Sequence, residues 1–192
     1  MKWLSRLFRR TETTQKTTAD RPFAIQRPTI GFLNLQDDAG APLLENDSRE
    51  LSPLFGNSLT STSDVPQCAV LFVYCDVEAT GKIRGTTQSL RGIFKKAGAY
   101  IAVVASENDP DSLMNAIDDD TGWPSNIVLI IDRKGDICTT FFHRLFQMMG
   151  SGTTMLMAWV ELAPQIPDYD NPNVPGSLML AEAGHLTFAH GG

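Results

Sequence analysis

The sequence predicts an α/β protein: a three-layer sandwich with a mainly parallel sheet and a C-terminal β-hairpin. The first observation is residues 127–131, an unbroken Ile-Val-Leu-Ile-Ile run, which is typical of a strand buried on both faces and indicates the centre of the sheet. The second is that shorter apolar runs at 68–76 and 100–105 alternate with segments of helical periodicity. Strands that alternate with helices favour parallel pairing with right-handed crossovers.

The length of 192 residues fits one domain with extensions. We expect a basic amphipathic arm and linker at residues 1–21, and an α/β domain at residues 66–192. Between them, residues 22–65 are rich in Pro, Gly, Asn, Asp and Ser and have only short apolar pieces. This composition predicts an irregular, partly disordered lead-in.

The domain begins with a predicted strand at residues 68–76. A helix follows, with Thr87 as its expected N-cap and Gly98 as its C-cap. The apolar residues of this helix recur at i, i+3, i+4 and i+7, and they are Leu90, Ile93, Phe94 and Ala97. The second strand is expected at residues 100–105.

The next helix has Asp109 as its N-cap and Pro110 at its first position. After the strand at 127–131, Asp136 is expected to cap a strongly apolar helix at 137–149. Residues 154–162 are interpreted as a fourth strand. A proline-rich loop then leads to two short strands, at 177–181 and 185–189, which we expect to form the hairpin.

Acidic residues at the strand ends carry two resemblances. With Asp76 after the first strand and Asp132 ending the third, the element order resembles a response-regulator receiver domain, and this resemblance implies phosphorylation of Asp132. The order also resembles the caspase/CHAT-like fold. That resemblance places Asp132-Arg133 and Glu161-Leu162 where the family has its catalytic His and Cys, which implies a domain without the protease dyad.

The same acidic residues are candidates for a metal site. Carboxylates at the carboxyl ends of parallel strands converge on one edge of the sheet, and Asp76, Asp132 and Glu161 there would suit Mg²⁺. The alternative is that these acids are solvated charges. On that alternative the chain has no cofactor.

A catalytic nucleophile is a separate candidate. Cys75 ends the first strand, where α/β enzymes place such groups, and His185 or His190 could activate it. The alternative is a small residue that only fills space at the strand end. None of the three cysteines forms a CxxC pair, so we expect reduced thiols and a cytoplasmic protein.

An anion site is predicted at Arg133, Lys134 and Gly135, because a glycine turn before a helix presents backbone N–H groups to a phosphate. The alternative is an ordinary strand-to-helix turn, since the chain lacks both GxGxxG and GxxxxGK[ST].

Charge is divided unevenly along the chain. Residues 1–21 have six basic and two acidic residues, a net charge of +4, whereas the other 171 have ten basic and twenty acidic, a net charge of −10. The acidic domain would repel nucleic acid. Residues 1–10 predict a short amphipathic helix for an anionic membrane surface or a partner's groove, with a charged tail as the alternative. Its contact residues would be Trp3, Leu4, Arg6, Leu7, Phe8, Arg9 and Arg10.

The 137–149 helix is too apolar for one buried stripe, so we expect it either to be sandwiched between other elements or to form part of an oligomer surface. Together with the proline-rich loop and Trp159, apolar surface of this kind favours binding over catalysis. The sequence therefore predicts a non-catalytic, bacterial-type signalling or scaffold module that binds a protein partner, with a homo-oligomer as a further option. The alternative is a small hydrolase-like or phospho-accepting enzyme that uses Asp76, Asp132 and Cys75.

Overall fold

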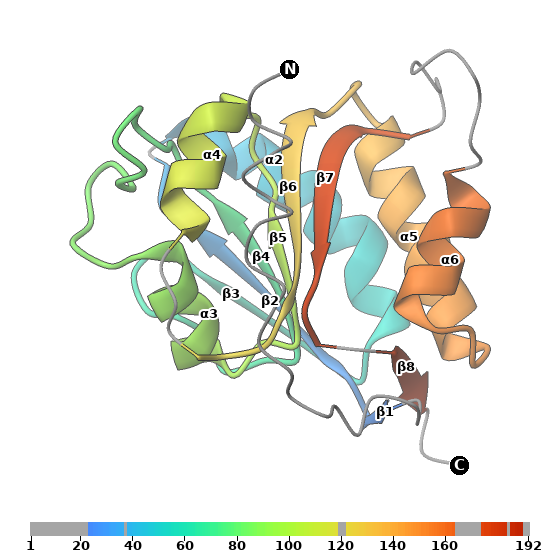
Figure 1. Cartoon of the computed structure of the whole chain (residues 1–192). Coiled ribbons are helices and arrows are strands. Elements are labelled where there is room, and N and C mark those ends of the chain that lie inside the picture. Colours follow the sequence, from blue (N-terminus) through green and yellow to red (C-terminus); the bar gives the residue numbers. More distant parts are fainter. Residues whose placement is uncertain (1–22, 37, 119–121, 164–173, 184, 190–192) are drawn as a thin grey trace.

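The computed structural model describes residues 23–36, 38–118, 122–163, 174–183 and 185–189. It is an α/β fold built on a six-stranded sheet with the order β3-β2-β4-β5-β6-β7 (Figure 1). The first five strands of this order are mutually parallel, and β7 is antiparallel to β6. The predicted fold class, α/β with a mainly parallel sheet, is confirmed.

The strands are β1 (Phe23–Gln26), β2 (Thr29–Asn34), β3 (Asn57–Ser61), β4 (Val70–Tyr74), β5 (Ile101–Val104), β6 (Asn126–Asp132), β7 (Gly176–Ala181) and β8 (Leu186–Ala189). The α-helices are α2 (Ala41–Leu51), α3 (Leu90–Ala97), α4 (Pro110–Ile117), α5 (Ile137–Gly150) and α6 (Met155–Leu162). Two short 3-10 helices, η2 (Asp38–Gly40) and η3 (Ser52–Leu54), flank α2.

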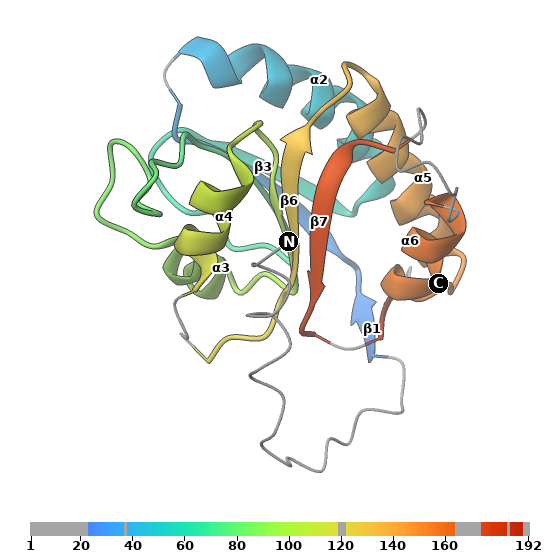
Figure 2. The same cartoon turned by 45° about the horizontal axis from the view of Figure 1, so that its top comes forward.

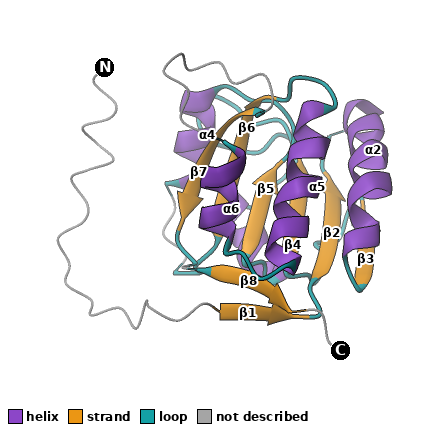
Figure 3. Cartoon of the chain, turned by 90° about the vertical axis from the view of Figure 1, so that its right-hand side faces the viewer, coloured by secondary structure: helices purple, strands orange, loops and turns teal. Residues whose placement is uncertain are grey.

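Helices cover both faces of the sheet. Helices α3 and α4 lie on one face, and α2, α5 and α6 lie on the other (Figures 1 and 3). Alternate residues of each strand enter the two cores. In β4, for example, Phe72 and Tyr74 join the core under α5, whereas Leu71 and Val73 join the core under α3.

The prediction of an irregular lead-in at residues 22–65 is wrong for residues 23–61. Strand β2 lies inside the sheet between β3 and β4, and its residues from Ile30 to Asn34 are buried. Gly31 lets the chain pass close to Cys68, because a Cβ atom at Gly31 would lie 2.6 Å from the Cys68 sulfur. Prolines and glycine in and around β2 are typical of loops, and for this reason the sequence predicts irregular structure where a buried strand lies.

Residues 127–131 form a buried strand, as expected, but β6 is the last parallel strand of the sheet and not its centre. The strand predicted at residues 154–162 is wrong, because these residues form helix α6. Thr154 accepts a hydrogen bond from the Met157 backbone N–H and so caps that helix. Met155 and Ala158 are buried on the α5 side of the sheet.

The two C-terminal strands lie at the expected residues, but each pairs with another strand and not with the other, as a simple hairpin would require. Strand β7 adds to β6 in antiparallel fashion, with a bulge between Ile130 and Asp132. Strand β8 pairs instead with β1, in parallel, as a separate two-stranded sheet at the foot of α5 and α6 (Figure 3). The first and last described strands are therefore neighbours.

The helix caps agree with the sequence in part. Gly98 ends α3 with a φ of 68°, and Asp109 caps α4 by accepting from the Ser112 N–H, both as predicted. The N-cap of α3 is Ser89 and not Thr87. Asp136 occupies the N-cap position of α5, but its side chain makes no capping hydrogen bond.

This difference between two aspartates yields a first prediction. Asp109→Ala removes a capping acceptor and should lower the free energy of unfolding by about 1 kcal/mol. Asp136→Ala removes no such bond and should cost less than half of that. Urea denaturation of the two variants provides the comparison, and equal losses would contradict the assignment of the caps.

Candidate functional site

The carboxyl ends of β4, β5 and β6 share one edge of the sheet, because these strands are parallel and in register. Asp76, just after β4, and Asp132, the last residue of β6, therefore lie on a common edge, as the sequence predicted. Strand β5 lies between them, so their strands are about 10 Å apart.

Each of these two carboxylates is bound by its own neighbours. Asp76 accepts hydrogen bonds from the side chains of Gln36 and Arg84, the latter at 3.0 Å. Asp132 accepts from the Lys134 backbone N–H at 3.0 Å. Within the described part of the chain, no group of three His, Cys, Asp or Glu side chains is arranged to hold a metal ion.

Glu161 does not belong to this edge in the way the sequence suggested. The sequence predicts Glu161 at the end of a strand, whereas in the structure it lies in the last turn of α6 and is exposed to solvent. The expected trio of Asp76, Asp132 and Glu161 as strand-end ligands is therefore not formed.

The structure also separates Cys75 from His185. Strand β7 runs from Gly176, opposite Asp132, to Ala181, opposite Asn126, so it ends at the other edge of the sheet. His185 follows that end and is exposed. Cys75 is fully buried, and burial, assisted by the charge of Asp76, raises the pKa of its thiol to about 12. The thiol is therefore protonated at neutral pH. His190 lies outside the described residues.

The predicted anion site is a tight turn whose arginine points inward. Lys134 and Gly135 adopt φ values of 52° and 63°, which suit a sharp strand-to-helix turn. Arg133 is 5% exposed, and its backbone N–H donates to Glu107 at 2.8 Å. The ordinary turn, which was the alternative, describes this segment better, because the guanidinium has another partner.

That partner is Asp47 of α2, which the sequence analysis did not single out. Asp47 is fully buried. Its Oδ1 accepts from Arg133 Nη2 at 2.8 Å and from the Thr139 hydroxyl at 2.6 Å. Its Oδ2 accepts from Arg133 Nη1 at 3.1 Å and from the Tyr74 hydroxyl at 2.7 Å. Four donors thus fill the acceptor positions of one carboxylate.

Arg133 extends this network to the segment after β5, because its Nη1 also donates to the carbonyl of Ala105, the residue that follows this strand, at 2.6 Å. Burial alone would lower the pKa of Arg133, but nearby groups, Asp47 among them, raise it overall. Burial and the charge of Asp47 both raise the pKa of Tyr74 well above its ordinary value. The Tyr74 phenol in this network is therefore neutral at pH 7.

One sequence signal could have identified Asp47. Leu44, Asp47 and Leu51 are spaced i, i+3 and i+7 in α2, so the aspartate lies on the face of the helix that turns to the core. A carboxylate on such a face needs a buried cation. Because residues 22–65 were interpreted as irregular, this spacing was not used.

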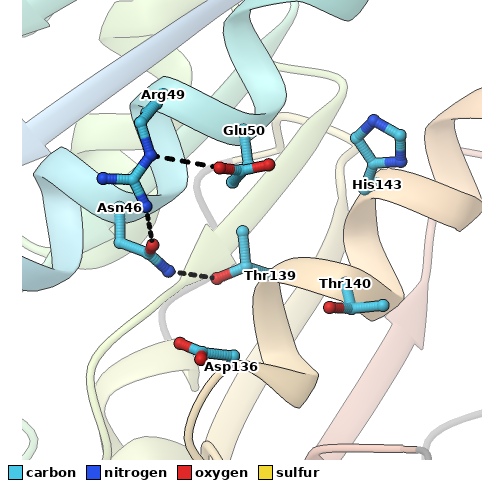
Figure 4. A pocket seen from close by; sticks show the side chains of 7 residues that line it. All are labelled: Asn46, Arg49, Glu50, Asp136, Thr139, Thr140 and His143. Atoms are coloured by element: carbon cyan, nitrogen blue, oxygen red, sulfur yellow. Dashed lines mark hydrogen bonds and ion pairs between the residues drawn. The ribbon is translucent and has the colours of Figure 1, made fainter.

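A cavity of about 310 Å³ opens above the network, between α2 and the first two turns of α5. These two helices meet beside the carboxyl end of β6 (Figure 2). Figure 4 shows the residues that line the cavity, namely Asn46, Arg49, Glu50, Asp136, Thr139, Thr140 and His143. The side-chain amide of Asn46 donates to Thr139 Oγ1 at 3.0 Å, and that hydroxyl donates to Asp47. Thr139 thus connects the cavity to the buried ion pair.

Comparisons with known proteins add no relative: no family model, no curated protein and no solved structure matches the chain. The resemblances to receiver domains and to the caspase/CHAT-like fold therefore remain predictions.

The buried pair yields a second prediction. Arg133→Met leaves Asp47 charged and buried without its cation, and should lower the free energy of unfolding by about 3–5 kcal/mol. Arg84→Met breaks the exposed ion pair with Asp76 and should cost about 1 kcal/mol or less. Guanidinium denaturation measures both.

The double variant Asp47→Leu/Arg133→Met provides the control for coupling. It removes both charges and should cost less than the sum of the two single changes. Additive losses would show that the two side chains act independently, and would contradict the network.

A third prediction concerns the thiols. Cys68, Cys75 and Cys138 are buried, and burial raises the pKa of each to about 12. In the native protein at pH 7.5, an aromatic disulfide reagent should therefore react slowly with all three and rapidly only after denaturation. A fast native reaction that disappears in Cys75→Ser would instead identify Cys75 as an activated nucleophile.

Proposed function

We propose that the chain is a non-catalytic interaction module, recruited through its basic N-terminal arm. The observation that carries the proposal is the buried contact of Arg133 with Asp47. Arg133, the buried cation that follows β6, stabilises the fold through this contact. Asp76, Asp132 and Cys75 are likewise occupied by internal contacts or burial.

The hydrolase-like or phospho-accepting alternative is less well supported. A cysteine nucleophile needs an imidazole within hydrogen-bond reach, and His185 lies at the opposite edge from Cys75. Phosphorylation of Asp132 with Asp76 as a metal ligand needs both carboxylates at one ion, whereas each binds separate neighbours.

Exposed apolar side chains support binding to a protein partner. Met157 and Val160 of α6 are 59% and 51% exposed. They are three residues apart and so share one face of the helix. On the inner side of α6, the ring of Trp159 packs edge-on against that of Phe141, with the ring centroids 4.9 Å apart. This contact leaves the face with Met157 and Val160 directed outward. A second copy of the chain is one partner that such a face would accept.

The arm lies outside the described residues, so its role rests on the sequence. Its net charge of +4 is opposite to the −10 of the rest of the chain. It would therefore bind an anionic membrane surface and hold the acidic domain away from it. In the described part of the chain, no helix is both long and apolar enough to pass through a bilayer.

The fourth prediction tests recruitment. The full chain should co-sediment with vesicles that contain phosphatidylserine, and binding should weaken with salt. Arg9→Gln/Arg10→Gln should weaken binding about 30-fold, because each basic residue near the surface contributes about 1 kcal/mol. A chain that begins at residue 22 should not bind.

The matched control is Lys95→Gln/Lys96→Gln. It removes the same charge from exposed positions at the end of α3 and should leave binding unchanged. Equal binding by the full and shortened chains would refute recruitment by the arm.

A further inference from the structure

A groove lined by four apolar residues, two glycines and two polar residues lies at the opposite edge of the sheet from the cavity. It has a volume of about 740 Å³ and lies between η3 and the last turn of α5. Its residues are Pro53, Leu54, Phe55, Gly56, Phe146, Gln147, Gly150 and Ser151. Leu54 and Phe55 are only half-buried, although both pack on the core. The groove is large enough for two or three apolar side chains.

The end of this groove favours a positively charged occupant. Gly150 is the last residue of α5, a 14-residue helix whose last turn contains no basic residue. The carboxyl end of a helix bears a partial negative charge that cations stabilise. An occupant should therefore combine apolar side chains with basic ones.

Residues 1–10 of this chain have that composition. Trp3, Leu4, Leu7 and Phe8 would share one face of a helix, and Arg6, Arg9 and Arg10 would lie on the other. We propose that this segment docks in the groove of its own chain, with its apolar face on Phe55 and its arginines at the end of α5. Docking would hide the face that recruitment needs, so the two states exclude each other.

The tether permits this docking. Phe188 of β8 packs against both Phe55 and Phe146, with ring centroids 5.6 and 5.8 Å away. Ile25 of β1 is the strand neighbour of Phe188. Phe23, the first described residue, therefore lies within roughly 20 Å of the groove, as judged from the spacing of residues and strands in a sheet. The twelve residues from 11 to 22 can span roughly 40 Å when extended, so the segment reaches the groove with length to spare.

The proposal can be tested without a membrane, so its failure is distinct from a failure of recruitment. A nitroxide attached to Ser5→Cys labels the arm selectively, because the native cysteines are buried. In the ¹⁵N-labelled full chain, the amide signals of Gly56, Gln147 and Ser151 should lose intensity. Amides in α3 and α4, on the other face of the sheet, should keep theirs.

Opposite charges at one exposed groove residue provide the matched variants. Gln147→Lys should lower the ratio of docked to free arm about two- to threefold, and Gln147→Glu should raise it by a similar factor. Leu4→Ser/Leu7→Ser in the arm should restore the lost intensity, and it leaves the folded domain untouched.

Two results would overturn the proposal. One is unchanged intensity at the three groove amides. The other is an equally large loss of intensity when spin-labelled ¹⁴N protein is mixed with unlabelled ¹⁵N protein, which would assign the groove to a second copy. Intensity loss that is independent of protein concentration and reversed by the arm variant supports docking within one chain.

Discussion

The contact between Arg133 and Asp47 organises the carboxyl edge of the sheet. The two residues are 86 positions apart in the sequence, and the contact joins α2 to the turn after β6. Through Tyr74, Ala105 and Thr139 it also engages β4, the segment after β5, and α5. A buried charge is tolerated only when it is paired and hydrogen-bonded, and every acceptor position of Asp47 is used. The geometry of this edge therefore depends on all of these elements being in place together.

This arrangement bears on how the polar strand ends should be interpreted. Open α/β sheets place ligands beyond the carboxyl ends of their strands where the strand order reverses, and here the order reverses between β2 and β4. At that point Gln36 and Arg84 both bind Asp76. In other α/β proteins, polar groups at this position bind a ligand. Here they bind one another and connect separate segments of the same chain. The cavity lies to one side, between α2 and α5, where Thr139 links it to the ion pair.

The fold was predictable wherever one pattern was strong. The buried runs of β4, β5 and β6 and the caps at Gly98 and Asp109 follow from local composition. Helix α6 was not predictable in this way, because its Met-Leu-Met-Ala-Trp-Val segment is apolar on nearly every side, and a short apolar run fits a helix or a strand equally well. Strand β2 was hidden by the residues around it.

The site was less predictable than the fold. Sequence order placed Asp76 and Asp132 on one edge, but it gave no indication of their bonding partners. The inward direction of Arg133 depends on Asp47, a residue in a helix that was not expected. A side chain's role depends on contacts between distant segments, and these appear only when the register of every strand is known.

The pairing of β1 with β8 has a consequence for synthesis of the chain. Gln26 and Leu186 are separated by 160 positions, so translation at about 5–20 residues per second leaves β1 without its partner for roughly ten to thirty seconds. During that interval the foot of α5 also lacks Phe188, which packs on Phe146. Until β8 emerges, the nascent domain therefore keeps β1 unpaired and an aromatic cluster uncovered, and during this period chaperones would have most to protect.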